Sequence, residues 1–313
     1  MFKRAIALAL GLGFASANLQ ADQGTTAASF LKLGTNARGI AMADAYGGVS
    51  DDVGAIAYNP SGLAFMTNKE LTFMHAVWFQ DIFYDYGALA WPIDGVGTIG
   101  LSVFYLNAGK FDKYEFDAFN NPKRTGEFTA SALTAGLSYA RALVPNISAG
   151  LNIKMINEQI ADYSAGSLAV DVSAMYKTPI SGLTLGGNVA NLGPSLGFEQ
   201  AFSLPITFRL GMGYKPLSNV TVAMDYNQPI ETAGVWSLGG EYGYRDTLYV
   251  RLGYRYQGAV DYNQTYTGYG PSVASGLALG LGLKLYKNYG ADYAYTPYGF
   301  LGSTHRISLG ARF

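Results

Sequence analysis

Apolar residues alternate with small or polar residues along most of the chain after Phe65, in runs bounded by Gly, Pro, Asn or Asp. The run from Leu277 to Leu285 is the clearest, because every odd position is leucine and the even positions are alanine, glycine, glycine and lysine. Residues 206–214 and 248–255 follow the same pattern and carry their charged residues on one face only. A period of two is typical of a β-strand whose two faces meet different surroundings.

The runs are about as long as strands that cross a bilayer, which have roughly ten residues. Their number is about fourteen, and transmembrane barrels favour even numbers. We expect strands at residues 70–79, 82–92, 96–106, 128–141, 147–157, 167–176, 183–191, 205–215, 219–227, 234–243, 247–257, 274–286, 288–296 and 304–313.

The polar face of these runs carries mostly Gly, Ala, Ser and Thr. The whole chain is 49% apolar, 14% aromatic and 14% charged, with a mean hydropathy of +0.11. A soluble sandwich usually carries more charge on its outer face, since soluble domains are about a quarter charged. No stretch is apolar for the roughly 18 residues that a membrane-spanning helix needs. The pattern therefore predicts an all-β fold, a transmembrane antiparallel β-barrel whose apolar face meets lipid and whose backbone groups pair within a closed sheet.

The connections between the runs alternate in length, as in barrels with short periplasmic turns and long extracellular loops. Long connections follow the third, fifth, seventh, eleventh and thirteenth runs, and short ones lie at residues 92–95, 143–146, 216–219, 244–246 and 287. The first connection, at Gln80 and Asp81, is a short exception. The alternation predicts a bacterial outer-membrane protein with both termini in the periplasm.

Aromatic residues end the apolar face of the even-numbered runs, which should finish on the periplasmic side. Tyr and Trp concentrate at membrane interfaces, and the alternative explanation is β-propensity alone. The last run resembles the terminal strand by which outer-membrane proteins are recognised, so we expect the barrel-assembly machinery as a partner. The predicted girdle consists of Trp91, Tyr139, Tyr176, Tyr214, Tyr242, Tyr286 and Phe313.

The first residues have the pattern of a secretory signal peptide. A basic start at residues 3–4 precedes an apolar stretch over residues 5–15 and small residues suited to cleavage after Ala17 or Ala21. A membrane anchor is the alternative, but the apolar stretch is shorter than a bilayer-spanning helix. We therefore expect residues 1–21 to direct export. The chain has no cysteine, so neither a disulfide framework nor a thiolate site is available to it.

Residues 22–68 lack strand alternation and contain short helix-like pieces at residues 37–45 and 53–58, interrupted by Gly-Gly and Asn-Pro pairs. Small residues allow close packing against barrel walls, and the breaks allow turns in a narrow lumen. A flexible periplasmic tail is the alternative, although such tails are usually poorer in apolar residues. We expect a plug of short helices inside a barrel that residues 69–313 form.

At this segment a resemblance to a known family becomes specific. Residues 30–46 (FLKLGTNARGIAMADAY) and 50–63 (SDDVGAIAYNPSGL) resemble the start of PorV/PorQ family outer-membrane proteins, which belong to the larger FadL-like superfamily. Further similar segments are residues 188–193, 204–211 and 291–309. The resemblance implies a fourteen-stranded barrel with an N-terminal hatch, which agrees with the strand count reached without it.

The resemblance implies two functions. FadL-like members take up long-chain fatty acids or other hydrophobic compounds and release them sideways into the membrane, whereas PorV-like members handle exported cargo in type IX secretion. We expect gated transport of a hydrophobic small molecule. One alternative is a PorV/PorQ-type component of type IX protein secretion that handles exported cargo beside a secretion-apparatus protein, and the other is a structural or otherwise non-transporting barrel. Tyr262, Tyr266 and Tyr269 would give the exposed aromatic loop surface that favours the secretion alternative.

Catalysis and metal binding are not expected. An enzyme needs a nucleophile, a base and an orienting group within reach. His75 falls on the apolar face of the first run, and His305 begins the last run near Ser303, but neither lies in a nucleophile motif. Asp51 and Asp52 lack the spacing of a calcium loop and fit the cap of the helix that follows them. We expect no cofactor and, since the formal net charge is -1 without a basic cluster, no nucleic acid.

Charged residues of mixed sign occupy predicted inward positions of the strands. We expect most of them to pair across the lumen and hold the plug, because unpaired charge in a narrow interior is costly, with a substrate path as the alternative. These residues are Asp171, Arg209, Asp225, Glu241, Arg251, Arg255, Asp292, Arg306 and Arg312.

The matched motif also implies where a ligand would meet the plug, if one binds. The implied contact residues are Arg38, Asp44, Asn59 and Pro60. Arg38 has two interpretations, since its guanidinium fits either a carboxylate head group or an anchor of the plug to Asp171 or Glu241.

Overall fold

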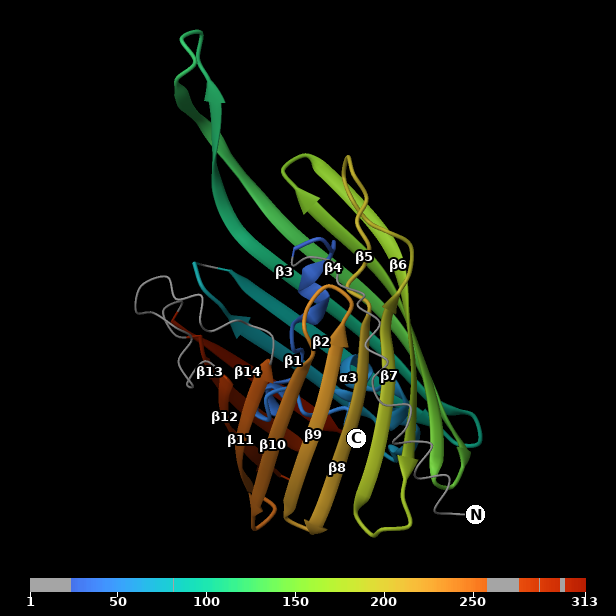
Figure 1. Ribbon diagram of the computed structural model, residues 1–313. Helices are drawn as coiled ribbons and strands as arrows, with labels where there is room; N and C mark the ends of the chain where they lie inside the picture. The colour runs from blue at the N-terminus through green and yellow to red at the C-terminus, as the bar shows by residue number, and fades with distance from the viewer. Residues whose placement is uncertain (1–23, 81, 258–275, 287, 299–301) are drawn as a thin grey trace.

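The structure of the protein is a computed structural model that describes residues 24–80, 82–257, 276–286, 288–298 and 302–313. Within these residues, fourteen antiparallel strands close into one barrel, and β1 pairs with β14 (Figure 1). Closure gives every strand a partner on both sides, but parts of the longer strands, such as β3 after Asn107 and β4 before Ala130, extend beyond their neighbours. The strands are β1 (Glu70–Val77), β2 (Phe83–Ile93), β3 (Gly97–Phe116), β4 (Pro122–Val144), β5 (Ile147–Ile160), β6 (Tyr163–Lys177), β7 (Leu183–Leu192), β8 (Thr207–Leu217), β9 (Val220–Pro229), β10 (Val235–Tyr244), β11 (Leu248–Gln257), β12 (Leu277–Leu285), β13 (Tyr289–Pro297) and β14 (Ser303–Arg312).

The alternation in sequence is an alternation between the outside and the inside of the barrel. In β12 the leucines at positions 279, 281, 283 and 285 point outward and are 46% to 51% exposed. Ala278, on the inward side of the same strand, is only 2% exposed. The same pattern gives most of the outer surface an apolar character. The predictions of an antiparallel barrel and of fourteen strands are therefore confirmed.

The hairpin of β3 and β4 is much longer than predicted and rises beyond the rest of the barrel (Figure 1). Residues 107–127 were expected to form a loop, but most of them continue the two strands as far as Phe116 and from Pro122. Above the barrel both faces of these strands meet solvent, so the apolar alternation that marks a half-buried strand is absent there. We call the end of the barrel with this hairpin the hairpin end, and the opposite end the turn end.

The connection between β5 and β6 is also a correction. It was expected to be long, but the two strands continue to Ile160 and from Tyr163, and a turn at Ala161 and Asp162 joins them. The connection after β7, residues 193–206, is long as predicted. The connection after β13 spans only residues 298–302, and most of the connection after β11, with Tyr262, Tyr266 and Tyr269, lies outside the described residues.

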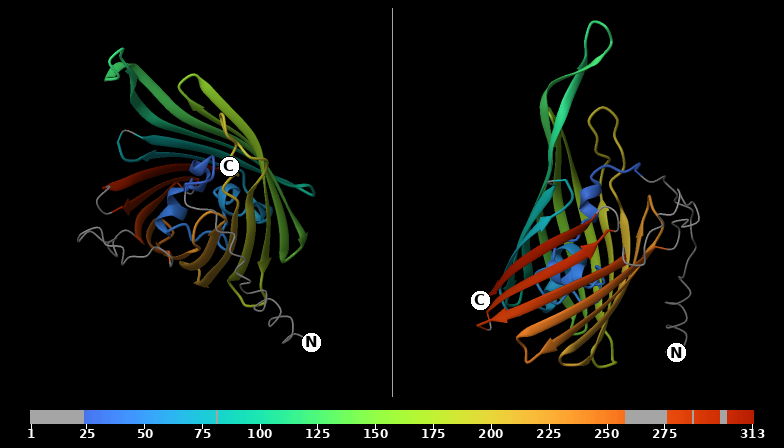
Figure 2. Two further views of the ribbon diagram at one scale, coloured as in Figure 1. Left: turned by 45° about the horizontal axis from the view of Figure 1, so that its top comes forward. Right: turned by 90° about the vertical axis from the view of Figure 1, so that its left-hand side faces the viewer.

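In the described residues before β1, four short helices lie inside the barrel (Figure 2). Small residues on both sides let backbone meet backbone: a Cβ placed on Gly280 of β12 would lie 2.3 Å from the Cβ of Ala41. No helix in the described part of the chain is long and apolar enough to cross a membrane. The predicted signal peptide, residues 1–21, lies outside the described residues. The helices are η1 (Ser29–Lys32), α2 (Ala37–Ala41), α3 (Ala55–Tyr58) and η2 (Pro60–Phe65).

Candidate functional site

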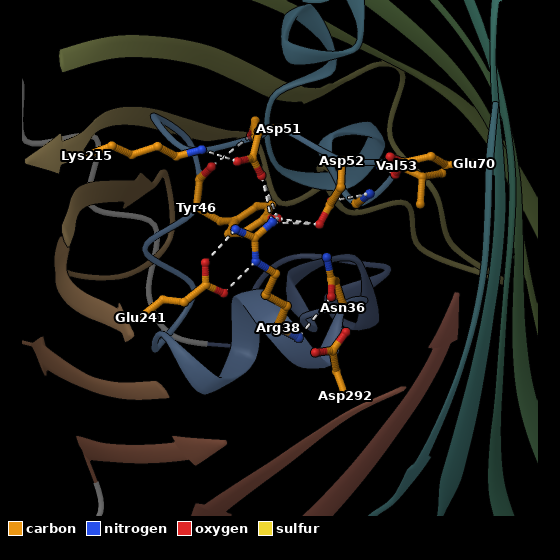
Figure 3. Close-up of polar contacts among 12 residues, drawn as sticks. Asn36, Arg38, Tyr46, Asp51, Asp52, Val53, Glu70, Lys215, Glu241 and Asp292 are labelled. Carbon is orange, nitrogen blue, oxygen red and sulfur yellow. Dashed lines mark hydrogen bonds and ion pairs between the residues drawn. The ribbon is translucent and has the colours of Figure 1, made fainter. Parts of the chain in front are cut away.

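Arg38 joins the plug to the barrel wall. The side chain of Asn36 accepts a hydrogen bond from the Arg38 backbone N–H at 2.9 Å and so begins helix α2. The guanidinium donates two parallel hydrogen bonds to Glu241 of β10, with both the Nε–Oε2 and the Nη2–Oε1 distance at 2.8 Å (Figure 3). A planar guanidinium and a carboxylate fit each other in this two-point geometry, which fixes direction as well as charge.

The same guanidinium also holds a second segment of the plug. Its Nη1 atom donates to Asp51 Oδ1 at 2.6 Å and to Asp52 Oδ2 at 2.9 Å, and it lies 2.7 Å from the Tyr46 hydroxyl oxygen. Arg38 therefore ties α2 to the segment before α3 and both of them to the wall.

Further ion pairs surround this centre. Lys215 lies 2.5 Å from Asp51, while Arg251 bridges Glu241 at 2.7 Å and Asp292 at 2.6 Å. Burial alone would raise the pKa of Asp51, but the ion pairs with Arg38 and Lys215 outweigh it and hold that pKa well below its usual range. We call the following set the Arg38 cluster: Arg38, Tyr46, Asp51, Asp52, Lys215, Glu241, Arg251 and Asp292.

Of the two interpretations of Arg38, the anchor of the plug has a contact in the structure, and the head-group interpretation stays a prediction. The structure places Arg38 on Glu241, one of the two predicted anchors, while the other, Asp171, pairs with Lys154 of the wall at 2.7 Å. The expected capping role of Asp51 and Asp52 needs correction. Asp52 Oδ1 accepts from the Gly54 backbone N–H at 2.8 Å, but Asp51 points to cations, because the buried guanidinium attracts it more strongly than the helix end does.

The other three implied contact residues also bind the plug or the wall. Asp44 accepts a hydrogen bond from the Tyr58 hydroxyl at 2.7 Å and pairs with Arg255. Asn59 is fully buried and donates to the Gly47 carbonyl at 2.9 Å, and Pro60 is buried beside it. Their positions are those of parts that shape and hold the plug.

The remaining predicted lumen charges differ in how they are neutralised. Asp225 is fully buried and accepts from the Gly47 backbone N–H at 2.7 Å, while Arg209 Nη1 lies 3.7 Å from Asp225 Oδ2. Arg312 pairs with Glu70 at 2.7 Å. Arg306 has no carboxylate within ion-pair distance in the described part of the chain and instead contacts the hydroxyls of Tyr84, Thr296 and Thr304.

The plug separates two cavities. The lower cavity, about 370 Å³, opens toward the turn end and is lined by the Arg38 cluster and its neighbours. The upper cavity, about 330 Å³, lies toward the hairpin end. On β11, which runs from the turn end to the hairpin end, Tyr249 and Arg251 line the lower cavity, whereas Arg255 and Gln257 line the upper one. Volumes of this size are at the small end of the range for ligand pockets.

The upper cavity is apolar on one side and polar on the other. Phe30 and Leu31 of the plug and Phe104 of β3 form the apolar side, and the rings of Phe30 and Phe104 stack with centroids 5.5 Å apart. The polar side consists largely of amides and paired charges from β5 to β9, and its members are Asn152, Lys154, Asp171, Asn188, Asn191, Arg209 and Asn227. Thr134 of β4 also lines the cavity and lies beside Phe104, its register partner. Such a cavity suits a molecule with one apolar and one polar part.

Sequence reasoning missed several of these side chains. Lys154 and Asn188 occupy inward positions of predicted strands, so strand parity would have placed them in the lumen had amides and lysines been considered. Glu231, whose side chain is fully buried and pairs with Lys32 of the plug at 2.6 Å, lies in a connection where no periodicity indicates direction.

The seven predicted girdle residues lie near the turn-end ends of the even-numbered strands or just beyond them. Trp91, Tyr139, Tyr214 and Tyr242 are 37% to 49% exposed, and Tyr286 and Phe313 follow their strands and are more exposed. Tyr176 is partly buried. Their contact with a membrane interface stays a prediction.

The two histidines both point outward. His75 Nδ1 lies 2.7 Å from Asp85 Oδ1, and His305 lies 2.7 Å from the Tyr293 hydroxyl and 3.4 Å from Ser303 Oγ. In the described ranges, no group of three or more His, Cys, Asp or Glu residues is placed to hold a metal ion.

No family model and no curated protein matches the sequence. Among solved structures, the toluene transporter TbuX of Ralstonia pickettii is similar, with a TM-score of 0.63 and 14% identity over 90% of this chain and 98% of that one. A FadL homologue of Pseudomonas aeruginosa gives 0.59 and 14% over 89% and 98%, and the toluene transporter TodX of Pseudomonas putida gives 0.52 and 12% over 82% and 91%.

These likenesses show that the chain has the fold of FadL-like barrels. They give no support to the narrower resemblance to PorV/PorQ.

Proposed function

We propose that the protein is a bacterial outer-membrane barrel for gated uptake of hydrophobic compounds, such as long-chain fatty acids or molecules of similar character. The observation that carries the proposal is the upper cavity, an apolar-sided space between the barrel wall and a plug that blocks the lumen. The fold likeness to two barrels named as toluene transporters supports it. Nothing in the described residues or the comparisons favours the secretion alternative.

The outer surface supports a membrane location. The outward residues Leu101 and Leu137, which are register partners on β3 and β4, are each about half exposed, and so is Leu281 on β12. Water-soluble monomers rarely expose apolar patches larger than a few hundred Å². A lipid environment removes this unfavourable exposure, and the aromatic residues at the turn end fit its interface.

The plug makes the uptake gated. A compound in the upper cavity is separated from the turn end by the Arg38 cluster, so it leaves either after the plug moves or through the wall. The pairing of β6 and β7 is irregular beside the cavity, where Ala190 and Asn191 both lie opposite Asp171 and Asn191 has a φ of 65°. We place the side exit at this irregularity, because regular pairing is already interrupted there.

Filling the upper cavity tests the proposal. Val235 lines the cavity, while Leu238 on the same strand faces outward and is 51% exposed. In cells that lack their own hydrocarbon transporter, Val235→Trp should reduce uptake of a labelled fatty acid or alkane severalfold, and the matched Leu238→Trp should not. Equal uptake by wild type, both variants and cells without the barrel would contradict the function, provided that fractionation finds each protein in the outer membrane.

A further inference from the structure

Three side chains of the upper cavity form a row across neighbouring strands. Asn188 of β7 is the register partner of Arg209 of β8, which is the register partner of Asn227 of β9. All three line the upper cavity. Since neighbouring strands lie about 4.8 Å apart, one small polar group can reach two members of the row at once.

The row holds buried polar atoms without hydrogen-bond partners in the described part of the chain. They are Asn188 Oδ1, Arg209 Nη1 and Asn227 Oδ1. Asn188 is only 6% exposed, and its Nδ2 donates to the Tyr58 carbonyl at 3.1 Å, so the oxygen is the atom left for another partner. A buried polar group without a partner is costly, and a bound molecule that supplies the partner removes that cost.

The charges around the row are already balanced. Each cation that lines the upper cavity has a carboxylate within ion-pair distance: Lys32 has Glu231, Lys154 has Asp171, Arg255 has Asp44, and Arg209 has Asp225 at 3.7 Å. A negatively charged head group would have to compete with these carboxylates. The cavity therefore offers hydrogen bonds without an excess of positive charge.

Together these contacts define the complementary group. It has to accept a hydrogen bond from Arg209 and donate one to Asn188 or Asn227. A hydroxyl does both, a carboxylate only accepts, and a hydrocarbon does neither. Resting on the proposed function, we propose that the substrate is an uncharged amphiphile whose hydroxyl or similar donor–acceptor group binds this row and whose apolar part lies against Phe30 and Phe104.

Binding of three matched probes to the full chain in lipid nanodiscs tests the inference. Decan-1-ol, decane and decanoate share chain length and differ only at the head, and empty nanodiscs correct for partition into lipid. Wild type should bind decan-1-ol most tightly. Asn227→Leu, which removes no described hydrogen bond, should weaken decan-1-ol about 3- to 10-fold, as expected for one neutral hydrogen bond, without weakening decane.

Gln257→Leu is the matched control, because this amide faces the same cavity two strands beyond Asn227, on the far side of Val235. It should leave the ratio of decan-1-ol to decane affinity unchanged. Equal affinity for decane and decan-1-ol in wild type and Asn227→Leu would overturn the inference and leave the proposed uptake intact. Failure of all three probes to bind would count against the uptake itself.

A preference for decanoate would also overturn the inference. Arg306 borders a small neighbouring cavity of about 90 Å³ together with Arg255 and Lys32. Of these three cations, Arg306 alone has no carboxylate within ion-pair distance in the described residues. If decanoate binds most tightly and Arg306→Met abolishes that preference, the substrate is an anion held beside Arg306.

Discussion

The two sides of the plug use polar side chains in opposite ways. On the turn side, Arg38 pairs with Glu241, Asp51 and Asp52 at 2.6 to 2.9 Å. Lys215 pairs in turn with Asp51, and Arg251 pairs with Glu241. On the hairpin side, the row of Asn188, Arg209 and Asn227 leaves acceptor and donor atoms without partners in the described residues. Both regions are largely buried and rich in polar atoms. Burial and polarity alone therefore do not distinguish a cluster that holds the plug from a site that binds a ligand.

The two regions differ in whether their hydrogen-bond donors and acceptors already have partners. A network whose donors and acceptors are all used gains nothing from a ligand and rigidifies what it joins. A row with unused atoms retains free energy that only an added partner can release. We therefore assign the holding of the plug to the Arg38 cluster and the recognition of substrate to the row.

Replacing Arg38 by Met should have the largest effect. It leaves three carboxylates around an apolar side chain, and breaking a buried ion pair by removing one partner typically costs about 3–5 kcal/mol. The plug should detach at the turn side, with faster hydrogen exchange over residues 37–58 and a rise in conductance across planar bilayers.

Arg38→Lys separates charge from geometry. An ammonium keeps the charge but lacks the planar fork that binds Glu241 at two points, so its exchange and conductance should fall between those of wild type and Arg38→Met. Unchanged exchange in Arg38→Met would mean that the small-residue packing between plug and wall, not the cluster, holds the plug.

Removing the charge of Asp225 should shift the row from a site for an uncharged head group toward a site for an anion. Asp225→Asn keeps an oxygen for the backbone N–H groups of Tyr46 and Gly47 but removes the negative charge beside Arg209. Arg209 then has an unbalanced charge next to the cavity. The preference for decan-1-ol over decanoate should shift toward decanoate by about tenfold, since hydrogen bonds to a charged partner are roughly twice as strong as neutral ones.

The control for Asp225→Asn is the same charge change at the turn end. Asp246→Asn removes a carboxylate that pairs with Lys284 at 2.8 Å, far from the row. It should leave probe preference unaltered. If both variants shift the preference equally, the overall charge of the lumen controls binding and the row does not.

The fold was accessible from sequence because most strands have an apolar outward side and a small or polar inward side. Leu279, Leu281 and Leu283 show strand, period and outward face at once. The alternation ends where the two faces of a strand no longer meet different surroundings. Residues 110–116 of the long hairpin are exposed on both faces, so alternating apolar and polar positions do not mark them as a strand. Periodicity reports an asymmetry of environment, and it is silent where the two faces are alike.

The site was accessible only in part. Strand parity brought Glu241, Arg251 and Asp292 into the lumen, and the plug motif singled out Arg38, but which residues meet across the barrel depends on how the plug turns inside it. Arg209 of the row was among the predicted lumen charges. The two asparagines were missed because asparagine in a strand carries no charge pattern, and their meaning comes from the register that aligns Asn188 with Arg209 and Asn227.

Acidification should weaken the lower region selectively, with the smallest effect of the three. The pKa of Asp51 is lowered in the folded protein, because the attraction of Arg38 and Lys215 exceeds the opposing effect of burial. Its contribution to stability is therefore complete above the pKa of an aspartate in the unfolded chain, about 3.9, and is lost as pH falls toward the lowered folded value. The difference in thermal unfolding midpoint between wild type and Asp51→Asn should be constant from about pH 7 to about pH 5 and should shrink below about pH 4.

Asp51 is partly exposed, so the difference in unfolding midpoint should also decrease with added salt. Decan-1-ol binding at the row should not follow Asp51: at each pH its affinity should be the same in wild type and in Asp51→Asn. If the decan-1-ol affinity of the wild type falls with pH together with the difference in unfolding midpoint, the Arg38 cluster and the row are coupled.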